Sequence, residues 1–133
     1  MQKIQTSEKI YISQSEIPNA ERGVFARVDI KKGEVIETCP IIEVSKDDTA
    51  KLNESLLVTY FFYFGKNKER LAITLGFGSI YNHSYKPNAT FKIRAKERLN
   101  DFIAIRDIKK DEEITFDYKH GNAKDGQPLW FEA

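Results

Sequence analysis

Short segments rich in β-branched and aromatic residues recur along the whole chain, and turn-forming residues separate them. Such side chains fit the pleated, half-buried surface of a strand, so the pattern predicts a mainly β protein. Strands are expected over Ile10–Ser13, Val24–Arg27, Val35–Thr38, Ile41–Val44, Leu71–Leu75, Thr90–Arg94, Phe102–Arg106 and Ile114–Phe116.

One segment, Thr49–Phe64, has helical spacing instead. Leu52, Leu56 and Tyr60 recur every four residues, and Tyr63 or Phe64 continues the series. This spacing places the side chains on one face of a helix. The aromatic run at the end of the segment competes with this interpretation, because aromatic residues also favour strands.

Length and charge limit the class of protein. A chain of 133 residues predicts one domain, residues 1–133, which is long enough for a hydrophobic core. The 21 basic residues are balanced by 20 acidic ones, so no general preference for nucleic acid follows. We expect no nucleic-acid partner.

Cysteine usage and hydropathy indicate the compartment. Cys39 is the single cysteine, so neither an internal disulfide nor a cysteine-rich zinc site is expected. The first residues lack the apolar core of a signal peptide. The longest apolar run, residues 56–65, is far shorter than the roughly 20 residues that span a bilayer. The sequence predicts a soluble, intracellular protein with no membrane partner.

Two segments repeat one plan. "ARVDIKKGEVIE" (26–37) and "AIRDIKKDEEIT" (104–115) share the order strand, Asp-Ile-Lys-Lys, turn, strand. The simplest interpretation is a pair of ordinary surface hairpins with solvated lysines at their tips. They would direct the strands that follow back into the body of the protein.

The cluster Asn82, His83 and Ser84 directly follows an apolar, glycine-punctuated run. Neighbouring side chains of an extended segment point to opposite faces, which disfavours a His83–Ser84 nucleophile and base. Hydrolase chemistry with a Cys39–His83 pair is also disfavoured. Two distant histidines without a third ligand match no usual metal spacing, so no metal site is predicted. Taken alone, the cluster could equally satisfy buried backbone groups around a turn.

Three motifs occur in a fixed order: "RGVFA" (22–26), "NHSYKPN" (82–88) and "EEITFDY" (112–118). Together they resemble the SET-domain family of protein lysine methyltransferases, over roughly residues 8 to 131. The compact length looks most like the minimal single-domain SET proteins of large algal viruses and bacteria. The resemblance implies a SET-domain (β-clip) fold of several small sheets, with one short helical segment and a threaded C-terminal crossing.

The chain departs from the family pattern in two ways. Glu21 replaces the first glycine of the opening motif, which bears on how closely that loop approaches the cofactor. The cysteine clusters of pre-SET and post-SET modules are absent, so neither module nor zinc is expected. The C-terminal residues would then close the site by themselves.

The resemblance implies that S-adenosylmethionine donates a methyl group to a lysine ε-amine. Tyr118 lies at the position of the family's catalytic tyrosine, where its hydroxyl would orient the amine and the methyl. Phe116 lies at the Phe/Tyr switch position. Because phenylalanine cannot hold a water in the channel, dimethylation or trimethylation is expected. Phe91 and Tyr63 are candidates for the channel wall, although a place in the hydrophobic core is the better interpretation of both.

The cofactor site is also implied by the resemblance. Arg22 and Gly23 match the loop whose backbone meets the methionine part of the cofactor, and glycine permits this close approach. The Asn82 amide would bond the cofactor. His83 would meet the adenine through its backbone, with its ring bracing the fold. Trp130 or Phe131 would stack on the adenine, and an aromatic plug at the end of the core is the other interpretation of this residue.

The expected partner is a lysine-bearing protein or peptide, such as a histone tail, and a homodimer is plausible. Acidic residues at Glu37, Glu43, Asp47 and Asp48 are candidates for a substrate groove, although a solvated acidic edge is the favoured interpretation. The protein is expected in the cytoplasm if it comes from a bacterium, and in the nucleus if it comes from a virus or a eukaryote. The main alternative is a catalytically weak SET-fold module that binds peptides or histones, and a non-protein amine is a further possible acceptor.

Overall fold

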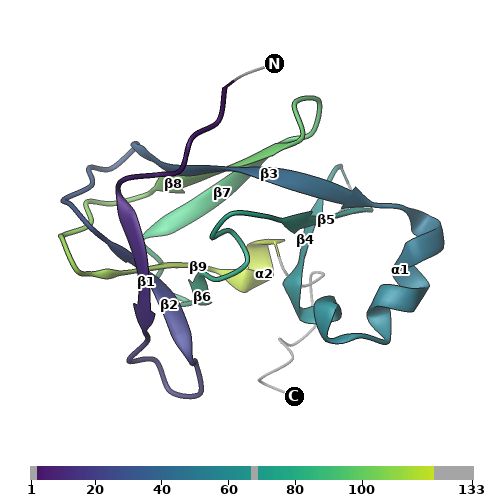
Figure 1. Cartoon of the computed structure of the whole chain (residues 1–133), viewed down its shortest axis with the longest axis horizontal. Coiled ribbons are helices and arrows are strands. Elements are labelled where there is room, and N and C mark those ends of the chain that lie inside the picture. The colour runs from purple at the N-terminus through teal and green to yellow at the C-terminus, as the bar shows by residue number, and fades with distance from the viewer. Residues whose placement is uncertain (1–2, 67–68, 122–133) are drawn as a thin grey trace.

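Two small sheets form the framework of the computed structural model, which describes residues 3–66 and 69–121 (Figure 1). One sheet has the strand order β1-β2-β9-β6 and the other has the order β4-β5-β3-β8-β7. The strands are β1 (Ile10–Gln14), β2 (Arg22–Ala26), β3 (Val35–Val44), β4 (Phe61–Phe64), β5 (Arg70–Thr74), β6 (Asn82–His83), β7 (Ala89–Arg94), β8 (Leu99–Ala104) and β9 (Glu113–Phe116). The helical elements are α1 (Lys46–Asn53), the 3-10 helix η1 (Leu56–Tyr60) and α2 (Tyr118–Gly121).

The mainly β prediction is confirmed, and the two strands expected on either side of Pro40 form one long strand, β3. Up to Pro40, β3 pairs with β8, and from Ile41 onward it pairs with β5. Proline cannot donate a backbone hydrogen bond, so a point where the ladder changes partner tolerates it. The carbonyl of Pro40 still accepts a hydrogen bond from the amide of Leu75 at 2.9 Å.

The predicted helix over Thr49–Phe64 is wrong in its second half. Helix α1 begins earlier, where the Ser45 hydroxyl accepts a hydrogen bond from the Asp48 amide, and it ends at Asn53. After η1, residues 61–64 form β4, which pairs with β5. Aromatic residues favour strands, and pairing with β5 satisfies backbone groups that a helix would have satisfied internally.

The two repeated segments pack against each other rather than standing as separate hairpins. Ile30 and Ile108, at equivalent positions of residues 26–37 and 104–115, exchange two backbone hydrogen bonds of 2.8 and 2.7 Å. Both side chains are buried. The repeats are therefore related by an approximate twofold axis through this isolated bridge.

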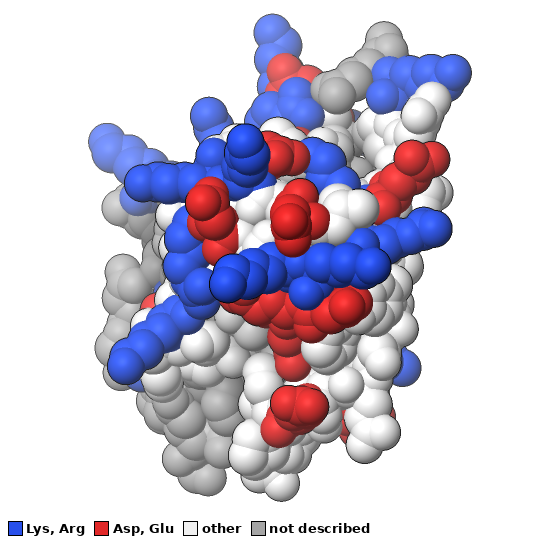
Figure 2. All heavy atoms as spheres, turned by 90° about the vertical axis from the view of Figure 1, so that its left-hand side faces the viewer, with Lys and Arg blue, Asp and Glu red and all other residues white. Residues whose placement is uncertain are grey.

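The aspartates of the repeats complete this symmetry. Asp107 accepts a hydrogen bond from the amide of Lys32 at 2.8 Å, and Asp29 accepts one from the amide of Lys110 at 2.9 Å. Each aspartate thus holds the turn of the other repeat. Figure 2 shows the face that carries these turns, where side chains of both charges are interleaved.

A crossing of two distant segments joins the motifs of residues 82–88 and 112–118. Strand β6 runs parallel to β9, with Asn82 opposite Thr115 and His83 opposite Phe116. The buried Asn88 fastens the crossing: its Oδ1 accepts from the Thr115 amide at 2.9 Å, and its Nδ2 donates to the Glu113 carbonyl at 2.8 Å. Because buried backbone groups require partners, this side chain fixes the register of the crossing.

The core next to the crossing is aromatic. Phe62, Phe91, Phe102 and Phe116 are buried and contact one another at ring-centroid distances between 5.0 and 6.4 Å. Rings at such separations add specific contacts to the burial of apolar area. This cluster gives β9 a rigid support just before Tyr118.

The described part of the chain contains neither a membrane-spanning helix nor a cluster of metal ligands. Among residues 3–66 and 69–121, no helix has the length and apolar character needed to cross a membrane. In the same ranges, histidine, cysteine and carboxylate side chains nowhere gather in threes as metal ligands would.

The role of Asn88 in the crossing is testable. Asn88→Ala would leave the Thr115 amide and the Glu113 carbonyl without their side-chain partner, so the free energy of unfolding should fall by about 1–3 kcal/mol. Urea denaturation measures the change. Asn53→Ala, at the exposed end of α1, is the matched control and should change stability by less than about 0.5 kcal/mol. Equal stability of the two variants would contradict the assignment.

Candidate active site

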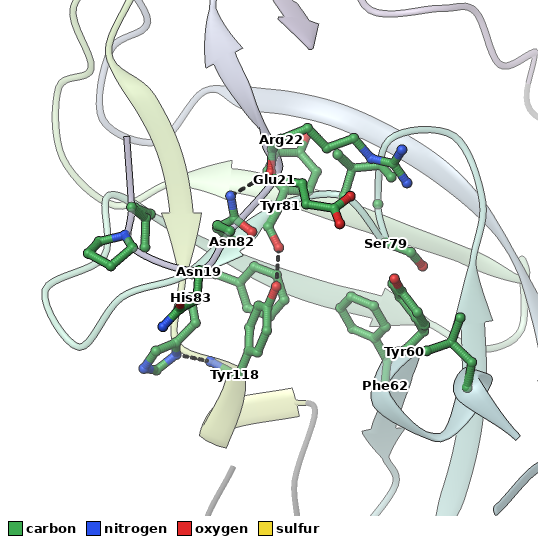
Figure 3. A pocket seen from close by; sticks show the side chains of 17 residues that line it. Asn19, Glu21, Arg22, Tyr60, Phe62, Ser79, Tyr81, Asn82, His83 and Tyr118 are labelled. Carbon is green, nitrogen blue, oxygen red and sulfur yellow. Dashed lines mark hydrogen bonds between the residues drawn. The ribbon is translucent and has the colours of Figure 1, made fainter. Parts of the chain in front are cut away.

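A pocket of about 650 Å³ opens beside the crossing of β6 and β9 (Figure 3). Its wall is built by the loop before β2, by η1 and β4, by the loop before β6 and by the end of β9 with the start of α2. The lining includes the polar or aromatic residues Asn19, Glu21, Arg22, Tyr60, Phe62, Ser79, Tyr81, Asn82, His83, Phe116 and Tyr118.

Tyr118 projects into the pocket from the first position of α2. Its hydroxyl donates a hydrogen bond to the backbone carbonyl of Tyr81 at 2.5 Å (Figure 3). Burial raises the pKa of the Tyr118 phenol, and the nearby Tyr60 and Glu113 raise it further. The phenol therefore stays protonated at neutral pH, with its proton directed at the Tyr81 carbonyl.

Aromatic side chains form the apolar part of the wall. Phe116 is buried two residues before Tyr118, and the two ring centroids lie 5.0 Å apart. Phe62 stacks on Phe116 at 5.6 Å, and Tyr60 lies beside it on the wall opposite Tyr118 (Figure 3). A side chain that entered here would leave water for a mostly aromatic surface.

Asn82 occupies the polar end of the pocket. Its Nδ2 donates hydrogen bonds to the Arg22 carbonyl and to Glu113 Oε2, both at 2.8 Å. Because both N–H bonds point at protein acceptors, Oδ1 is the atom of this side chain that can accept a hydrogen bond from a ligand.

Glu113 holds this arrangement from behind. Its carboxylate also accepts a hydrogen bond from the Ser15 hydroxyl at 2.8 Å. A Cβ atom at Gly23 would collide with that carboxylate and would come within 2.9 Å of Asn82 Nδ2. Gly23 thus makes room for the Glu113–Asn82 contact, and this is why the strand β2 carries glycine here.

His83 braces the start of α2. Its ring Nδ1 accepts a hydrogen bond from the Tyr118 amide at 3.0 Å and lies 3.7 Å from Asp117 Oδ1. An Nδ1 that accepts a backbone N–H carries no proton itself. The ring therefore supports the backbone of the residue that projects into the pocket.

Glu21 and Arg22 lie on the rim. Glu21, which stands where the family pattern has glycine, is exposed and lines the pocket, and Figure 3 shows its carboxylate directed toward the interior. The side chain of Arg22 is also exposed. Residue 21 thus adds an acidic group to a wall where glycine would present only backbone.

The structure brings Arg22, Asn82, His83, Phe116 and Tyr118 to one pocket, with Gly23 behind it. The two channel candidates are not among the residues that line this pocket. Phe91 on β7 packs inside the aromatic core, and Tyr63 alternates with Phe62 along β4 and so faces away from the pocket. Trp130 falls outside the described residues.

The four acidic candidates for a substrate groove do not line this pocket either. Glu37 is buried beneath the loop before β6, where Tyr81 and the Phe77 amide contact it. Glu43 forms an exposed ion pair with Arg70 at 2.6 Å. The two aspartates begin α1, where their charges favour the helix N-terminus.

Sequence reasoning missed Tyr60, Phe62, Ser79 and Tyr81 as pocket residues. The helical interpretation of residues 49–64 hid the first two, because it placed Tyr60 and Tyr63 on one face. A strand period of two over β4 would have placed Phe62 and Tyr63 on opposite faces of the strand. No sequence signal marks the contribution of the Tyr81 backbone carbonyl.

The raised pKa of Tyr118 has a measurable consequence. In the unfolded chain a tyrosine releases its proton near pH 10. The folded chain keeps this proton, so its contribution to stability is complete below about pH 10 and falls as the pH rises above that value. Urea midpoints between about pH 9 and 11 should therefore fall less steeply in Tyr118→Phe than in the wild type. Equal slopes would show that burial of this phenol does not affect its ionisation.

A scan against family models matches residues 21–119 to the SET domain. A curated relative from Schizosaccharomyces pombe, a histone-lysine N-methyltransferase specific for lysine 37 of histone H3, is 32% identical over 112 residues. The match covers 84% of this chain and 70% of that relative.

Solved structures agree. A candidate histone methyltransferase of Plasmodium falciparum superposes with a TM-score of 0.66 at 31% identity, covering 88% of this chain and 96% of the other. The Polycomb repressive complex 2 of Chaetomium thermophilum, bound to S-adenosylmethionine, gives a TM-score of 0.72 at 23% identity; the match covers 90% of this chain and 16% of that one. The second likeness concerns the fold alone. With the family match extending from the pocket rim at Glu21 through Tyr118, the chain belongs to the SET-domain family.

Proposed function

We propose that the chain is a protein-lysine N-methyltransferase that uses S-adenosylmethionine. The observation that carries the proposal is the Tyr118 phenol, protonated and bonded to the Tyr81 carbonyl at the aromatic end of a pocket whose polar end presents Asn82. The relatives in the comparisons include a named histone-lysine methyltransferase, which supports the same reaction.

The polar end suits the cofactor. Asn82 Oδ1 is available to accept a hydrogen bond from an ammonium group, and the acidic Glu21 and Glu113 favour positive charge nearby. The pocket volume of about 650 Å³ falls in the range of ordinary ligand sites. When bound, S-adenosylmethionine supplies an electrophilic methyl group on a positively charged sulfur.

The aromatic end suits a lysine side chain. A free lysine amine has a pKa of about 10.4 and is protonated near neutral pH, so it must lose a proton before it can act as a nucleophile. Tyr60, Phe62 and Phe116 would surround it with apolar surface, which disfavours the charged form and lowers the pKa of the amine. The proton leaves to solvent through the open side of the pocket.

Tyr118 orients the reacting groups. Its proton is directed at the Tyr81 carbonyl, so the hydroxyl oxygen would act toward the amine as a hydrogen-bond acceptor. It would accept a hydrogen bond from the neutral amine and hold the amine lone pair toward the methyl carbon. Orientation of this kind accounts for a large part of the barrier reduction in group transfer.

Histones are the proposed substrates, because the curated relative acts on histone H3. Such a substrate implies a nuclear site of action. A histone-binding module with little turnover is the second candidate, and a non-protein amine is a third possible acceptor. Transfer of radiolabelled methyl groups to core histones distinguishes the first from the other two.

Tyr118→Phe should lower the rate of methyl transfer to core histones by about 100-fold, because the hydroxyl that orients the amine is lost. Tyr11→Phe is the matched control: it removes one hydroxyl, bonded to Asp111 on the exposed side of β1, and should transfer at the wild-type rate. Scintillation counting of labelled histones measures both. A wild type that neither labels histones nor binds S-adenosylmethionine in calorimetry would end the enzyme proposal.

Asn82→Ala should weaken the binding of S-adenosylmethionine by roughly tenfold or more, because one hydrogen bond to a charged group contributes about 1.5–3 kcal/mol. Isothermal titration calorimetry on the protein without substrate measures this. Unchanged affinity would remove Asn82 from the cofactor site.

Phe116 should allow more than one methyl group to be added. We expect dimethyl- or trimethyl-lysine from the wild type, because Phe116 contributes no hydroxyl to hold a water beside the amine. Phe116→Tyr should shift the product toward monomethyl-lysine. Mass spectrometry of a histone H3 peptide mixture under excess cofactor measures the states, and a wild type that stops at one methyl would contradict the prediction.

A further inference from the structure

A buried carboxylate lies behind the pocket wall, and the proposed chemistry does not use it. Glu37, near the start of β3, is only 9% exposed. Its Oε1 accepts a hydrogen bond from the Tyr81 hydroxyl at 2.8 Å, and its Oε2 accepts one from the Phe77 amide at 3.0 Å. Both oxygens are therefore occupied by donors from the loop that precedes β6.

Tyr81 connects this carboxylate to the pocket. Its ring is buried and stacks on Phe102 with the centroids 4.3 Å apart, while its hydroxyl bonds to Glu37. Burial raises the pKa of Tyr81, and the charge of Glu37 raises it further, so the hydroxyl remains a donor. At the other end of the residue, the backbone carbonyl accepts the Tyr118 hydroxyl (Figure 3).

The fold makes room for this carboxylate. Gly76 has a φ of +64°, and a Cβ atom there would lie 2.8 Å from Glu37 Oε2. Removing a carboxylate from water costs free energy that two hydrogen bonds offset only in part. An apolar residue at this place would avoid that cost but would leave the Tyr81 hydroxyl and the Phe77 amide without their acceptor.

A carboxylate at position 37 can accept both of these hydrogen bonds, whereas an amide cannot. The Tyr81 hydroxyl and the Phe77 amide approach different oxygens of Glu37. A glutamine has one accepting oxygen, so its NH₂ group would face one of the two donors. The side chain at position 37 thus holds two points of the loop at once, and Tyr81 is held at its ring, its hydroxyl and its carbonyl.

We propose that Glu37 and the Tyr81 side chain are positioning residues for methyl transfer: they fix the Tyr81 carbonyl in the place that directs the Tyr118 hydroxyl. This inference rests on the proposed function, because it gives Tyr118 its role in the reaction. It predicts that a side chain outside the pocket, on a strand behind it, controls the orientation of the phenol inside.

Three variants test the inference. Tyr81→Phe keeps the stack on Phe102 and removes the hydroxyl, and Glu37→Gln keeps the shape and removes one acceptor. Thr38→Val is the matched control, because it removes a 2.7 Å hydrogen bond to Asp101 from the next position of the same strand. Thermal melts show how far each variant loses stability.

The first measurement needs neither cofactor nor substrate. In protein labelled with ¹³Cζ-tyrosine, the Tyr118 resonance, assigned with Tyr118→Phe, reports the hydrogen bond of its phenol. We expect this resonance to shift in Tyr81→Phe and Glu37→Gln and to stay in place in Thr38→Val. An unchanged resonance in the first two variants would overturn the proposal, whatever the protein catalyses.

The second measurement uses methyl transfer to core histones. Tyr81→Phe and Glu37→Gln should each lower kcat by about tenfold, with the KM for S-adenosylmethionine unchanged within about twofold, since Asn82 and Glu113 are not affected. The double variant should be no slower than the slower single variant, because both act through one contact. An equal loss of kcat in Thr38→Val, or additive losses in the double variant, would overturn the proposal.

The two proposals fail separately. If the wild type transfers no methyl group, the proposed function fails, while the shift of the Tyr118 resonance still tests the positioning contact. If the wild type is active and both variants keep its kcat, the function stands and the positioning role of Glu37 is wrong.

Discussion

The crossing of β6 and β9 is the constraint on which the rest of the pocket depends. Two parallel residue pairs form a very short ladder, which by itself contributes little stability. Asn88 compensates, because its buried amide bonds to the backbone of β9 at Glu113 and Thr115. With the register fixed there, Asn82 and Tyr118 necessarily emerge at the same pocket.

Two carboxylates then hold the pocket from behind. Glu113 bonds to the amide of Asn82 at the polar end, and Glu37 bonds to the hydroxyl of Tyr81 near the phenol. Both are close to a glycine that leaves them space, Gly23 and Gly76. Glu37 is buried and Glu113 is partly buried, and removing charge from water costs stability, so their use here agrees with a site whose geometry matters more than the free energy of folding.

The sequence predicted the strands well, but it predicted the segment of residues 49–64 and the contacts between the repeats less well. β-Branched and aromatic segments predicted the strands because side-chain fit to a pleated surface is local. The spacing of residues 49–64 misled, because Tyr60 and Tyr63 satisfy a helical period while β4 obeys a period of two. The repeats at 26–37 and 104–115 were visible, but their reciprocal aspartate contacts were not.

The sequence by itself determined the family and the mainly β class, and it singled out Asn82, His83, Phe116 and Tyr118, which line one pocket, because ordered motifs preserve residue type and spacing. Only the tertiary structure decided which atoms face the pocket. The Tyr81 carbonyl accepts the Tyr118 hydroxyl, and Glu37 lies buried behind it rather than in an acidic groove. Both depend on contacts between residues about 40 positions apart, and such contacts are set by packing, which local sequence patterns do not encode.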